Sequence, residues 1–350
     1  MMKGNEALAE GAIRAGCRFF FGYPITPQNE VPEYMSRRMP EVGGVFLQAE
    51  SEVSAINMVY GAAGAGGRVM TSSSSPGISL KQEGISYIAC AQLPCVIVNV
   101  ARGGPGLGGL TPSQSDYFQA TKGGGHGDYH LIVYAPGTVQ EMVDLVSLAF
   151  DKADQYRNPA MILTDAIVGQ MMEPVILPQM REMKKNDKPW ATTGKKNRKP
   201  NIINSLGLLG EDLEKMNIEL QEKYQRIEAN EVRYEEDGVE DADLVVVAYG
   251  TSSRVVKSAV TMAREEGRKV GIFRPITLWP FPKKALAALS KAGKKFLVVE
   301  ISAGQMIEDV ILAVKDDSKV GFYGRLNGAI PTVREVYNKI MELSSRKEEE

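Results

Sequence analysis

Short apolar runs alternate with longer segments of helical spacing through the first half of the chain. The apolar runs predict strands at 18–22, 44–47, 68–72, 94–100, 131–135 and 160–164. Between them, the spacing of apolar residues predicts helices at 27–38, 50–64, 78–91 and 139–156. Strands that alternate with helices in this way indicate an α/β fold, in which helices cover both faces of a parallel sheet.

This alternation stops near residue 174 and resumes near residue 241. Residues 174–200 are rich in proline, lysine and asparagine, which predicts a linker or an exposed arm. The charged stretch 211–237 has helical spacing and is predicted as a helix on a surface, first as an ordinary solvated helix and second as a partner contact.

The last part of the chain predicts a second, smaller doubly wound unit. Its strands are expected at 242–250, 270–275 and 294–302, and its helices at 253–266 and 282–292. We therefore expect two doubly wound domains, joined by a linker and a charged helix, with bounds at 1–175, 176–238 and 239–345.

Composition narrows the class of protein. The 350 residues carry a net charge of −2, so charge gives no reason to expect nucleic acid or an acidic membrane surface as a partner. No stretch approaches the ~20 apolar residues of a membrane span, and the first residues read as an amphipathic helix, so we expect a cytoplasmic protein.

The three cysteines, Cys17, Cys90 and Cys95, form no CxxC pair. Because a [4Fe–4S] cluster needs about four thiolates, this chain is not expected to hold one alone.

A proline-containing turn, 23–27, follows the first predicted strand. Thr26 is placed as the N-cap of the next helix and Pro27 as its first residue, which explains the turn without any function. The turn also lies at the carboxyl end of a parallel strand, where open α/β sheets bind ligands. A free helix N-terminus there could hold an anion such as a substrate carboxylate.

Two acidic residues, Glu50 and Glu52, open the next helix, which is rich in small residues. Acidic residues in a first turn are commonly partners of the helix dipole, and spacing alone favours that interpretation. A carboxylate in this place could instead exchange a proton with a bound heterocycle.

Arg102 follows a strand of core character and opens a glycine-rich loop. The loop is not the fingerprint of a nicotinamide dehydrogenase, because no G-x-G-x-x-G opens a helix at the first βα turn. An arginine at a strand end suits bidentate capture of a carboxylate or phosphate.

His126, Asp128 and His130 lie in another glycine-rich run, with no helix to bring the rings together, so we predict a turn there and no metal site.

Four segments together resemble the alpha-type chain of the 2-oxoacid:ferredoxin oxidoreductase family: YPITP, QAESE before a Gly/Ala-rich helix, TSSSSPGISL and ARGGPG. The likeness is strongest over about residues 1–180. It continues in DADLVVVAYGTSSR and VGIFRPITLWPFP, which are similar to the C-terminal domain of transketolase. The stretches AESEVSAINMVYGAAGAGGRVM and QSDYFQATKGGGHGDY look most like subunits that act on 2-oxoisovalerate (3-methyl-2-oxobutanoate).

The resemblance implies that the first domain binds the pyrimidine end of thiamine diphosphate. Glu52 matches the family's glutamate that hydrogen-bonds the aminopyrimidine ring, and it is preferred to Glu50 because its spacing to Gly61 fits the family pattern. Thr26 and Arg102 match residues that bind the substrate carboxylate. The implied cofactor-binding residues are Glu52, Tyr23, Pro24 and Ile25.

The implied reaction is the oxidative decarboxylation of a 2-oxoacid, with electrons passing to ferredoxin and the acyl group to coenzyme A. Thiamine enzymes hold the diphosphate and Mg²⁺ through a Gly-Asp-Gly motif, which this sequence lacks. The diphosphate, the metal and the iron–sulfur clusters are therefore expected on partner chains. The resemblance implies a beta-type thiamine-diphosphate-binding subunit, a gamma subunit and a ferredoxin-like subunit.

Two alternatives stay open at this point. One is the same reaction on 2-oxoglutarate or pyruvate, and the other is a non-catalytic nucleotide- or coenzyme-A-binding α/β subunit. No Arg or Lys occurs in 103–121, so a second substrate carboxylate has no partner there, unless Lys81, Lys122 or a partner chain supplies one. The same segment offers apolar and aromatic side chains for a branched tail, namely Leu107, Leu110, Tyr117 and Phe118.

Overall fold

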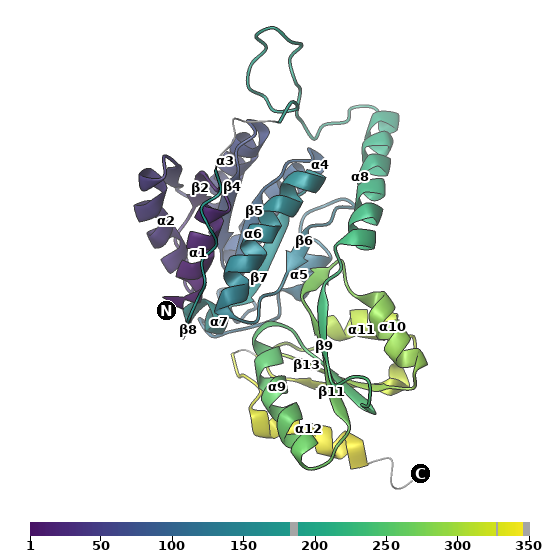
Figure 1. The fold of residues 1–350 in the computed structure, drawn as a ribbon. Coiled ribbons are helices and arrows are strands. Elements are labelled where there is room, and N and C mark those ends of the chain that lie inside the picture. The colour runs from purple at the N-terminus through teal and green to yellow at the C-terminus, as the bar shows by residue number, and fades with distance from the viewer. Residues whose placement is uncertain (183–187, 327, 346–350) are drawn as a thin grey trace.

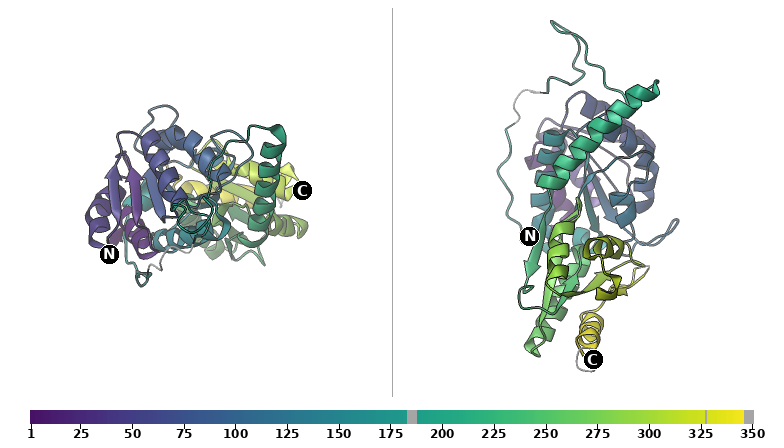
Figure 2. Two further views of the ribbon diagram at one scale, coloured as in Figure 1. Left: turned by 90° about the horizontal axis from the view of Figure 1, so that it is seen from above. Right: turned by 90° about the vertical axis from the view of Figure 1, so that its right-hand side faces the viewer.

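The computed structural model describes residues 1–182, 188–326 and 328–345, so residues 183–187 of the predicted linker lie outside the described part. Two sheets organise the chain, one in each half, and the long helix α8 (Gly210–Asn230) runs along the outside of the first unit toward the second (Figures 1 and 2). This arrangement confirms the predicted α/β class with parallel sheets.

The first sheet has seven strands in the order β12-β6-β7-β5-β4-β2-β3. All neighbours pair in parallel except β12, which pairs antiparallel with β6. The central strands are buried along their whole length, as expected for a parallel sheet covered on both faces. The strands are β2 (Phe19–Gly22), β3 (Val45–Gln48), β4 (Val69–Ser73), β5 (Val96–Ala101), β6 (Ile132–Tyr134), β7 (Ala160–Asp165) and β12 (Thr277–Trp279).

The helices of the first unit pack in two groups, α1 with α2 and α6, and α3 with α4. Gly11 lets α1 lie close to α6, because a Cβ there would stand 3.0 Å from the Val146 side chain and 3.1 Å from the Val143 backbone. The helices are α1 (Gly4–Arg14), α2 (Glu30–Glu41), α3 (Glu52–Gly64), α4 (Ser75–Cys90), α5 (Tyr117–Thr121), α6 (Val139–Tyr156) and α7 (Ala166–Gln170).

The second sheet has five strands in the order β14-β13-β10-β11-β9, with β9 antiparallel at one edge. Helix α9 packs with α12, and α10 packs with α11. The strands are β9 (Tyr234–Asp237), β10 (Leu244–Val247), β11 (Val270–Pro275), β13 (Lys295–Glu300) and β14 (Val320–Gly324). The helices are α9 (Gly250–Glu265), α10 (Lys283–Lys291), α11 (Met306–Val314) and α12 (Val333–Ser345).

The helix predicted at 27–38 is present as α2, but the prediction that it begins at Pro27 with Thr26 as its N-cap is wrong. Residues 25–28 form a separate turn, in which the Gln28 amide donates to the Ile25 carbonyl at 3.1 Å. Helix α2 therefore begins only at Glu30, with Asn29 in the cap position.

The prediction of one helix over 211–237 is also wrong at its end. Helix α8 stops at Asn230, and residues 234–237 form β9 on the second sheet. The Tyr234 ring stacks on Phe273 of β11 at 5.0 Å, so pairing with the sheet overrides the local helical spacing. The sequence patterns also did not predict that β12 crosses to the first sheet.

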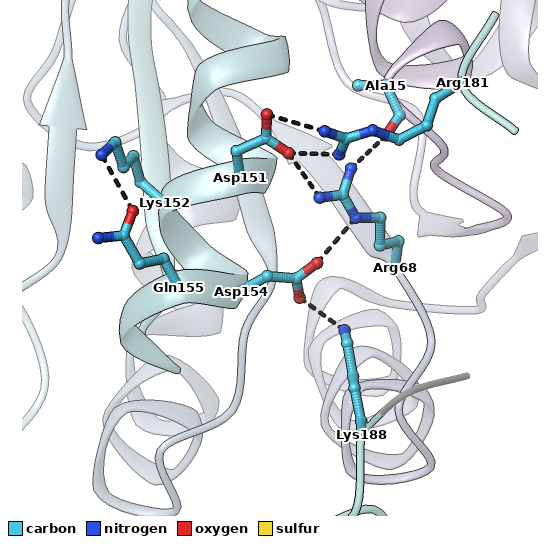
Figure 3. Close-up of polar contacts among 8 residues, drawn as sticks. All are labelled: Ala15, Arg68, Asp151, Lys152, Asp154, Gln155, Arg181 and Lys188. Carbon is cyan, nitrogen blue, oxygen red and sulfur yellow. Dashed lines mark hydrogen bonds and ion pairs between the residues drawn. The ribbon is translucent and has the colours of Figure 1, made fainter. Parts of the chain in front are cut away.

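The segment that joins the two units is held against the first one by charge (Figure 3). Strand β8 (Met172–Glu173) pairs with β1 (Met2–Lys3) before the segment begins. Arg68 then contacts Asp151 at 2.6 Å and Asp154 at 2.8 Å on α6. From the joining segment, Arg181 pairs with Asp151 and Lys188 pairs with Asp154, the latter at 2.5 Å. The described parts on both sides of 183–187 are thus attached to the same helix.

Candidate active site at the strand ends

The predicted site residues lie at the carboxyl ends of neighbouring parallel strands. The turn 23–27 follows β2, Glu52 follows β3, and Arg102 follows β5. Strand β4, between β5 and β2, ends in the serine run 72–75. Because these four strands are adjacent, their loops share one edge of the sheet, which is where open α/β sheets bind ligands.

Glu52 is the first residue of α3 and is almost completely buried. Ser51 caps the helix through its hydroxyl, which accepts from the Ser54 amide at 3.2 Å. A Cβ at Gly77 of α4 would stand 2.7 Å from Glu52 Oε1, so the carboxylate occupies space that only a glycine leaves open. Glu50, by contrast, is exposed and hydrogen-bonded to the Ser54 hydroxyl. The two acidic residues therefore differ in burial, and Glu52 is the one placed inside the site.

Arg102 connects the turn after β2 with the glycine-rich loop. Its side chain is buried, and Nη1 donates to the Thr26 carbonyl at 2.8 Å while Nη2 donates to the Leu107 carbonyl at 3.0 Å. The Arg102 amide in turn donates to the Ser75 hydroxyl at 2.9 Å. The third guanidinium nitrogen, Nε, is buried and has no partner in the described structure. The structure thus brings Arg102 and Thr26 together and leaves one donor unused.

The turn itself presents an open surface above a buried support. Pro24 and Thr26 are exposed, and Tyr23 and Ile25 are half-buried. Gln28 lies buried beneath them, where it donates to the Tyr23 carbonyl at 3.3 Å.

The segment TSSSSPGISL contributes to the family resemblance, but no role was predicted for its individual serines, for Asn99 or for Asp116. The hydroxyls of Ser73 and Ser74 are buried and have no hydrogen-bond partner in the described structure. Ser75 donates to Asp116 at 2.6 Å, and Asn99 donates to the same carboxyl oxygen at 2.8 Å. Burial raises the pKa of Asp116, while these two hydrogen bonds lower it. The signal that could have found them is the run of four serines directly after a buried strand.

A cavity of about 750 Å³ adjoins Arg102 and lies between the two sheets. Its walls come from the glycine-rich loop 103–106, from the start of α4 and from the segment 301–305 of the second unit. Its lining exposes more apolar than polar surface, and Asp116 contributes the one carboxyl group in it.

The two histidines lie in different surroundings. His126 meets the edge of the Tyr87 ring, whereas His130 stacks on Trp279 at 4.5 Å. Burial lowers the pKa of His130. In the described ranges, no group of three or more His, Cys, Asp or Glu side chains is placed to hold a metal ion. None of the described helices is long and apolar enough to cross a membrane.

Comparison with known families gives matches over most of the chain. A family model described as "Pyruvate flavodoxin/ferredoxin oxidoreductase, thiamine diP-bdg" matches residues 10–240. A second one, "Pyruvate:ferredoxin oxidoreductase core domain II", matches residues 242–336.

Individual relatives agree with these matches. The chain is 54% identical to the ketoisovalerate oxidoreductase subunit VorB of Methanothermobacter thermautotrophicus, over 98% of this chain and 97% of that one. It is 38% identical to the 2-oxoglutarate synthase subunit KorA of Methanothermobacter marburgensis, over 97% and 98%.

A solved structure has the same fold. It is the 2-oxoglutarate:ferredoxin oxidoreductase from Magnetococcus marinus with 2-oxoglutarate, coenzyme A and succinyl-CoA bound, with a TM-score of 0.86 and 28% identity. The alignment covers 97% of this chain, which spans 64% of the solved chain.

Proposed function

Because the chain belongs to the pyruvate flavodoxin/ferredoxin oxidoreductase family and is a subunit of such an oxidoreductase, we propose that it holds the pyrimidine ring of thiamine diphosphate at the edge formed by β5, β4, β2 and β3. The observation that carries this proposal is the Glu52 carboxylate, buried at the start of α3 and lying over the bare backbone of Gly77.

The residues present fit a heterocycle better than a charged group. Glu52 supplies a carboxyl that can exchange a proton with a ring nitrogen, and Ser73 and Ser74 supply buried hydroxyls without partners. The half-buried side chains of Tyr23 and Ile25, together with Pro24, offer apolar surface at the same edge.

In this proposal each residue of the chain has one task. When bound, thiamine diphosphate would supply a carbon nucleophile for the 2-oxo group of the substrate. Glu52 holds or moves the proton at the pyrimidine ring nitrogen. Arg102 directs a guanidinium toward the substrate carboxylate beside Thr26, and its unpaired Nε is the donor still free to do so. The buried positions of Glu52 and Arg102 keep water away from both side chains and strengthen their interactions.

We also propose that the site is completed by other chains. The sequence has no Gly-Asp-Gly motif for a diphosphate and Mg²⁺. Burial raises the pKa of Cys17 and of Cys95 to about 12, so neither thiol is poised as a cluster ligand. A beta-type subunit would hold the diphosphate and metal, while a gamma subunit and a ferredoxin-like subunit would serve coenzyme A and the electrons. Domain bounds of 1–175, 176–238 and 239–345 remain part of this proposal.

For the substrate we propose a branched-chain 2-oxoacid, 2-oxoisovalerate, which agrees with the named activity of the VorB relatives. A 2-oxoglutarate enzyme needs a cation for the second carboxylate. Lys122 pairs with Asp309 at 2.6 Å, and Lys81 is fully buried with its ammonium on Thr71 and Ser72, so both are already engaged.

The loop after Arg102 supplies apolar side chains for that substrate only in part. Leu107 and Leu110 are exposed and free to cover a branched tail. Tyr117 does not serve this purpose, because it is fully buried and donates to Asp309 at 2.6 Å. The proposed pocket therefore depends on the two leucines and on Phe118.

Reconstitution tests these proposals. The purified chain alone is expected to show no iron–sulfur absorbance and no oxoacid-dependent reduction of a viologen dye, whereas the complex with its partner chains reduces the dye only with thiamine diphosphate. Turnover by the single chain contradicts the proposed division of labour. In the complex, kcat/KM is expected to be higher for 2-oxoisovalerate than for 2-oxoglutarate or pyruvate. The opposite order overturns the substrate and leaves the cofactor assignment in place.

A further inference from the structure

A buried lysine lies behind the proposed catalytic carboxylate. Lys81 is on α4, one helical turn after Gly77, and no part of its side chain is exposed. Its Nζ donates to the Thr71 hydroxyl at 2.7 Å and to the Ser72 carbonyl at 3.0 Å. Residues four apart share one face of a helix, so Gly77 and Lys81 face the same way. The lysine is thus attached to the strand that ends in the serine run.

Burial of an ammonium group is costly unless an anion is near. For Lys81 the anion is Glu52 of α3, the charged side chain whose field acts on it. Strand β4 contributes only the uncharged Thr71 and Ser72 to the same ammonium. Burial lowers the pKa of Lys81 to about 7, and Glu52 acts in the opposite direction. Glu52 lies over Gly77 and Lys81 follows Gly77 by one turn of α4, so the two charged groups lie on the same side of that helix, where α3 packs against it.

We propose that Lys81 is a positioning residue for the thiamine chemistry: its ammonium attracts the Glu52 carboxylate and favours the orientation in which that carboxylate crosses Gly77 toward the pyrimidine ring. The role of Lys81 rests on the proposed function, because it acts through Glu52 and touches neither substrate nor cofactor.

The chain offers a matched control. Lys223 on α8 is also buried, and burial lowers its pKa to about 7. Its Nζ donates to the Arg157 carbonyl at 3.2 Å, and it lies near Arg226 rather than near Glu52. Lys81→Met and Lys223→Met each remove one buried ammonium and keep a side chain of similar length. Only the first removes the proposed partner of Glu52.

The first experiment uses the purified full chain without any cofactor. Because the folded-state pKa of Lys81 is about 7 against 10.5 for a free lysine, the unfolded chain binds more protons between these values. The folding constant of the wild type is therefore expected to gain about tenfold per pH unit across this window relative to Lys81→Met. The wild type is expected to gain on Lys223→Met in the same way, because burial lowers the pKa of Lys223 to about 7 as well. In the Glu52→Gln background, the pH range over which Lys81 makes folding depend on pH is expected to begin at lower pH, because Lys81 loses its anion. An unchanged pH range means that Lys81 and Glu52 are not coupled.

The second experiment measures the reconstituted complex. Lys81→Met is expected to lower kcat by about tenfold, the effect of losing about 1.4 kcal/mol of interaction. Its pH profile is expected to change near neutrality, with little change in KM, because Lys81 touches neither substrate nor cofactor. Lys223→Met is expected to leave both kcat and the profile unchanged. In the Glu52→Gln background, Lys81→Met is expected to add no further loss, since residues that act as a unit are not additive.

Three results overturn the role of Lys81: a wild-type kcat and pH profile in Lys81→Met, an equal loss in Lys223→Met, or additive losses in the double variant. Lys81→Gln, which keeps a hydrogen-bonding end without the charge, is a second neutral variant if Lys81→Met does not fold. If the wild-type complex shows no dependence on thiamine diphosphate, the proposed function fails, while the titration of the isolated chain still decides whether Glu52 and Lys81 form a pair.

Discussion

The strand ends of the two sheets differ in whether their buried polar atoms are hydrogen-bonded, although both sheets belong to doubly wound units. In the first unit, the ends of β4 and β5 carry buried polar atoms without partners, namely the hydroxyls of Ser73 and Ser74 and Nε of Arg102. Among residues 239–326 and 328–345, which supply most of the second unit, no buried side-chain oxygen or nitrogen lacks a partner.

The corresponding edge of the second unit is occupied by the first one. At the end of β10, Thr251 donates to Asp165 at 2.8 Å, and Ser252 donates to Gln114 at 2.6 Å. Gln114 also donates to the Tyr249 carbonyl at 2.8 Å and accepts from the Ile301 amide at 3.0 Å. The polar groups that could bind a ligand at this edge are therefore already hydrogen-bonded across the contact between the units.

The two units therefore have similar architecture but different hydrogen bonding at their strand ends. Position at the carboxyl end of a strand marks where ligands bind, but unused hydrogen-bonding capacity decides which edge can still bind one. By this criterion we expect the first unit to carry the chemistry and the second unit to hold the loops of the first in place. Substitutions at the two edges are expected to separate catalysis from stability.

The largest effect is expected for Glu52→Gln at the open edge. The amide keeps the size of the side chain but cannot pass a proton, and general acid–base terms are worth about 10²–10⁴ in rate. We expect kcat of the reconstituted complex to fall by that order, with unfolding of the chain little changed. Glu50→Gln is the control, because Glu50 is exposed, and its effect is expected to be much milder. A greater loss in Glu50→Gln than in Glu52→Gln contradicts the assignment.

Arg102→Ala is expected to have the next largest effect, on KM for the oxoacid. A charge-assisted hydrogen bond in a buried site is worth about 1.5–3 kcal/mol, or roughly ten- to a hundredfold. Arg102→Lys is expected to restore only part of this, because lysine cannot reach the Thr26 and Leu107 carbonyls with a planar fork. Steady-state kinetics with both substrates checks the assignment: a changed response to coenzyme A with an unchanged KM for the oxoacid moves Arg102 to the second substrate.

Much of the first sheet could be predicted, because its strands are uninterrupted apolar runs and its helices have clear spacing. The cap at Thr26 and the end of the charged helix could not. Both depend on distant contacts, namely the link between Arg102 and Thr26 and the pairing of β9 with β11. Local propensity contains no information about either of these partners.

The candidate site shows the same limit. The resemblance supplied Glu52, Thr26 and Arg102, and the structure places Arg102 against the Thr26 backbone. Their roles as catalytic and substrate-binding residues stay predictions. The burial of Lys81 could not be read from the sequence, because an isolated lysine in a helix is normally exposed. Its position becomes clear only when β4 and α3 are seen on either side of it.

At the occupied edge, Thr251→Val is expected to reduce stability without changing catalysis. The substitution keeps the shape of the side chain and removes the hydroxyl donor to Asp165, a buried carboxyl that then retains the backbone amides of Ile167, Val168 and residue 251. Loss of one partner of a buried polar group costs about 1–3 kcal/mol. Denaturant unfolding of the chain measures the loss. A lower kcat in a complex that is still fully assembled contradicts a purely supporting role for this edge.

The smallest effect is expected from Glu300, which ends β13 and is fully buried. Its carboxyl accepts the amides of Gln305, Met306 and Ile307, at 3.0–3.3 Å, where α11 begins. Burial nevertheless raises the pKa of Glu300 above 4.5, so the folded chain keeps this proton longer than the unfolded chain does. The stability that this contributes is fully present below pH 4.5 and is lost as the pH rises through the folded-state pKa.

Glu300→Gln removes this titration, and its unfolding free energy is therefore expected to gain on that of the wild type as the pH rises above 4.5. The gain is at most about 1.4 kcal/mol per pH unit within the window, and it ends where the folded-state carboxyl has fully ionised. Urea unfolding of both chains at a series of pH values measures the difference. If the wild type gains on the variant instead, the three amides at the start of α11 outweigh burial, and Glu300 is then an ionised helix cap.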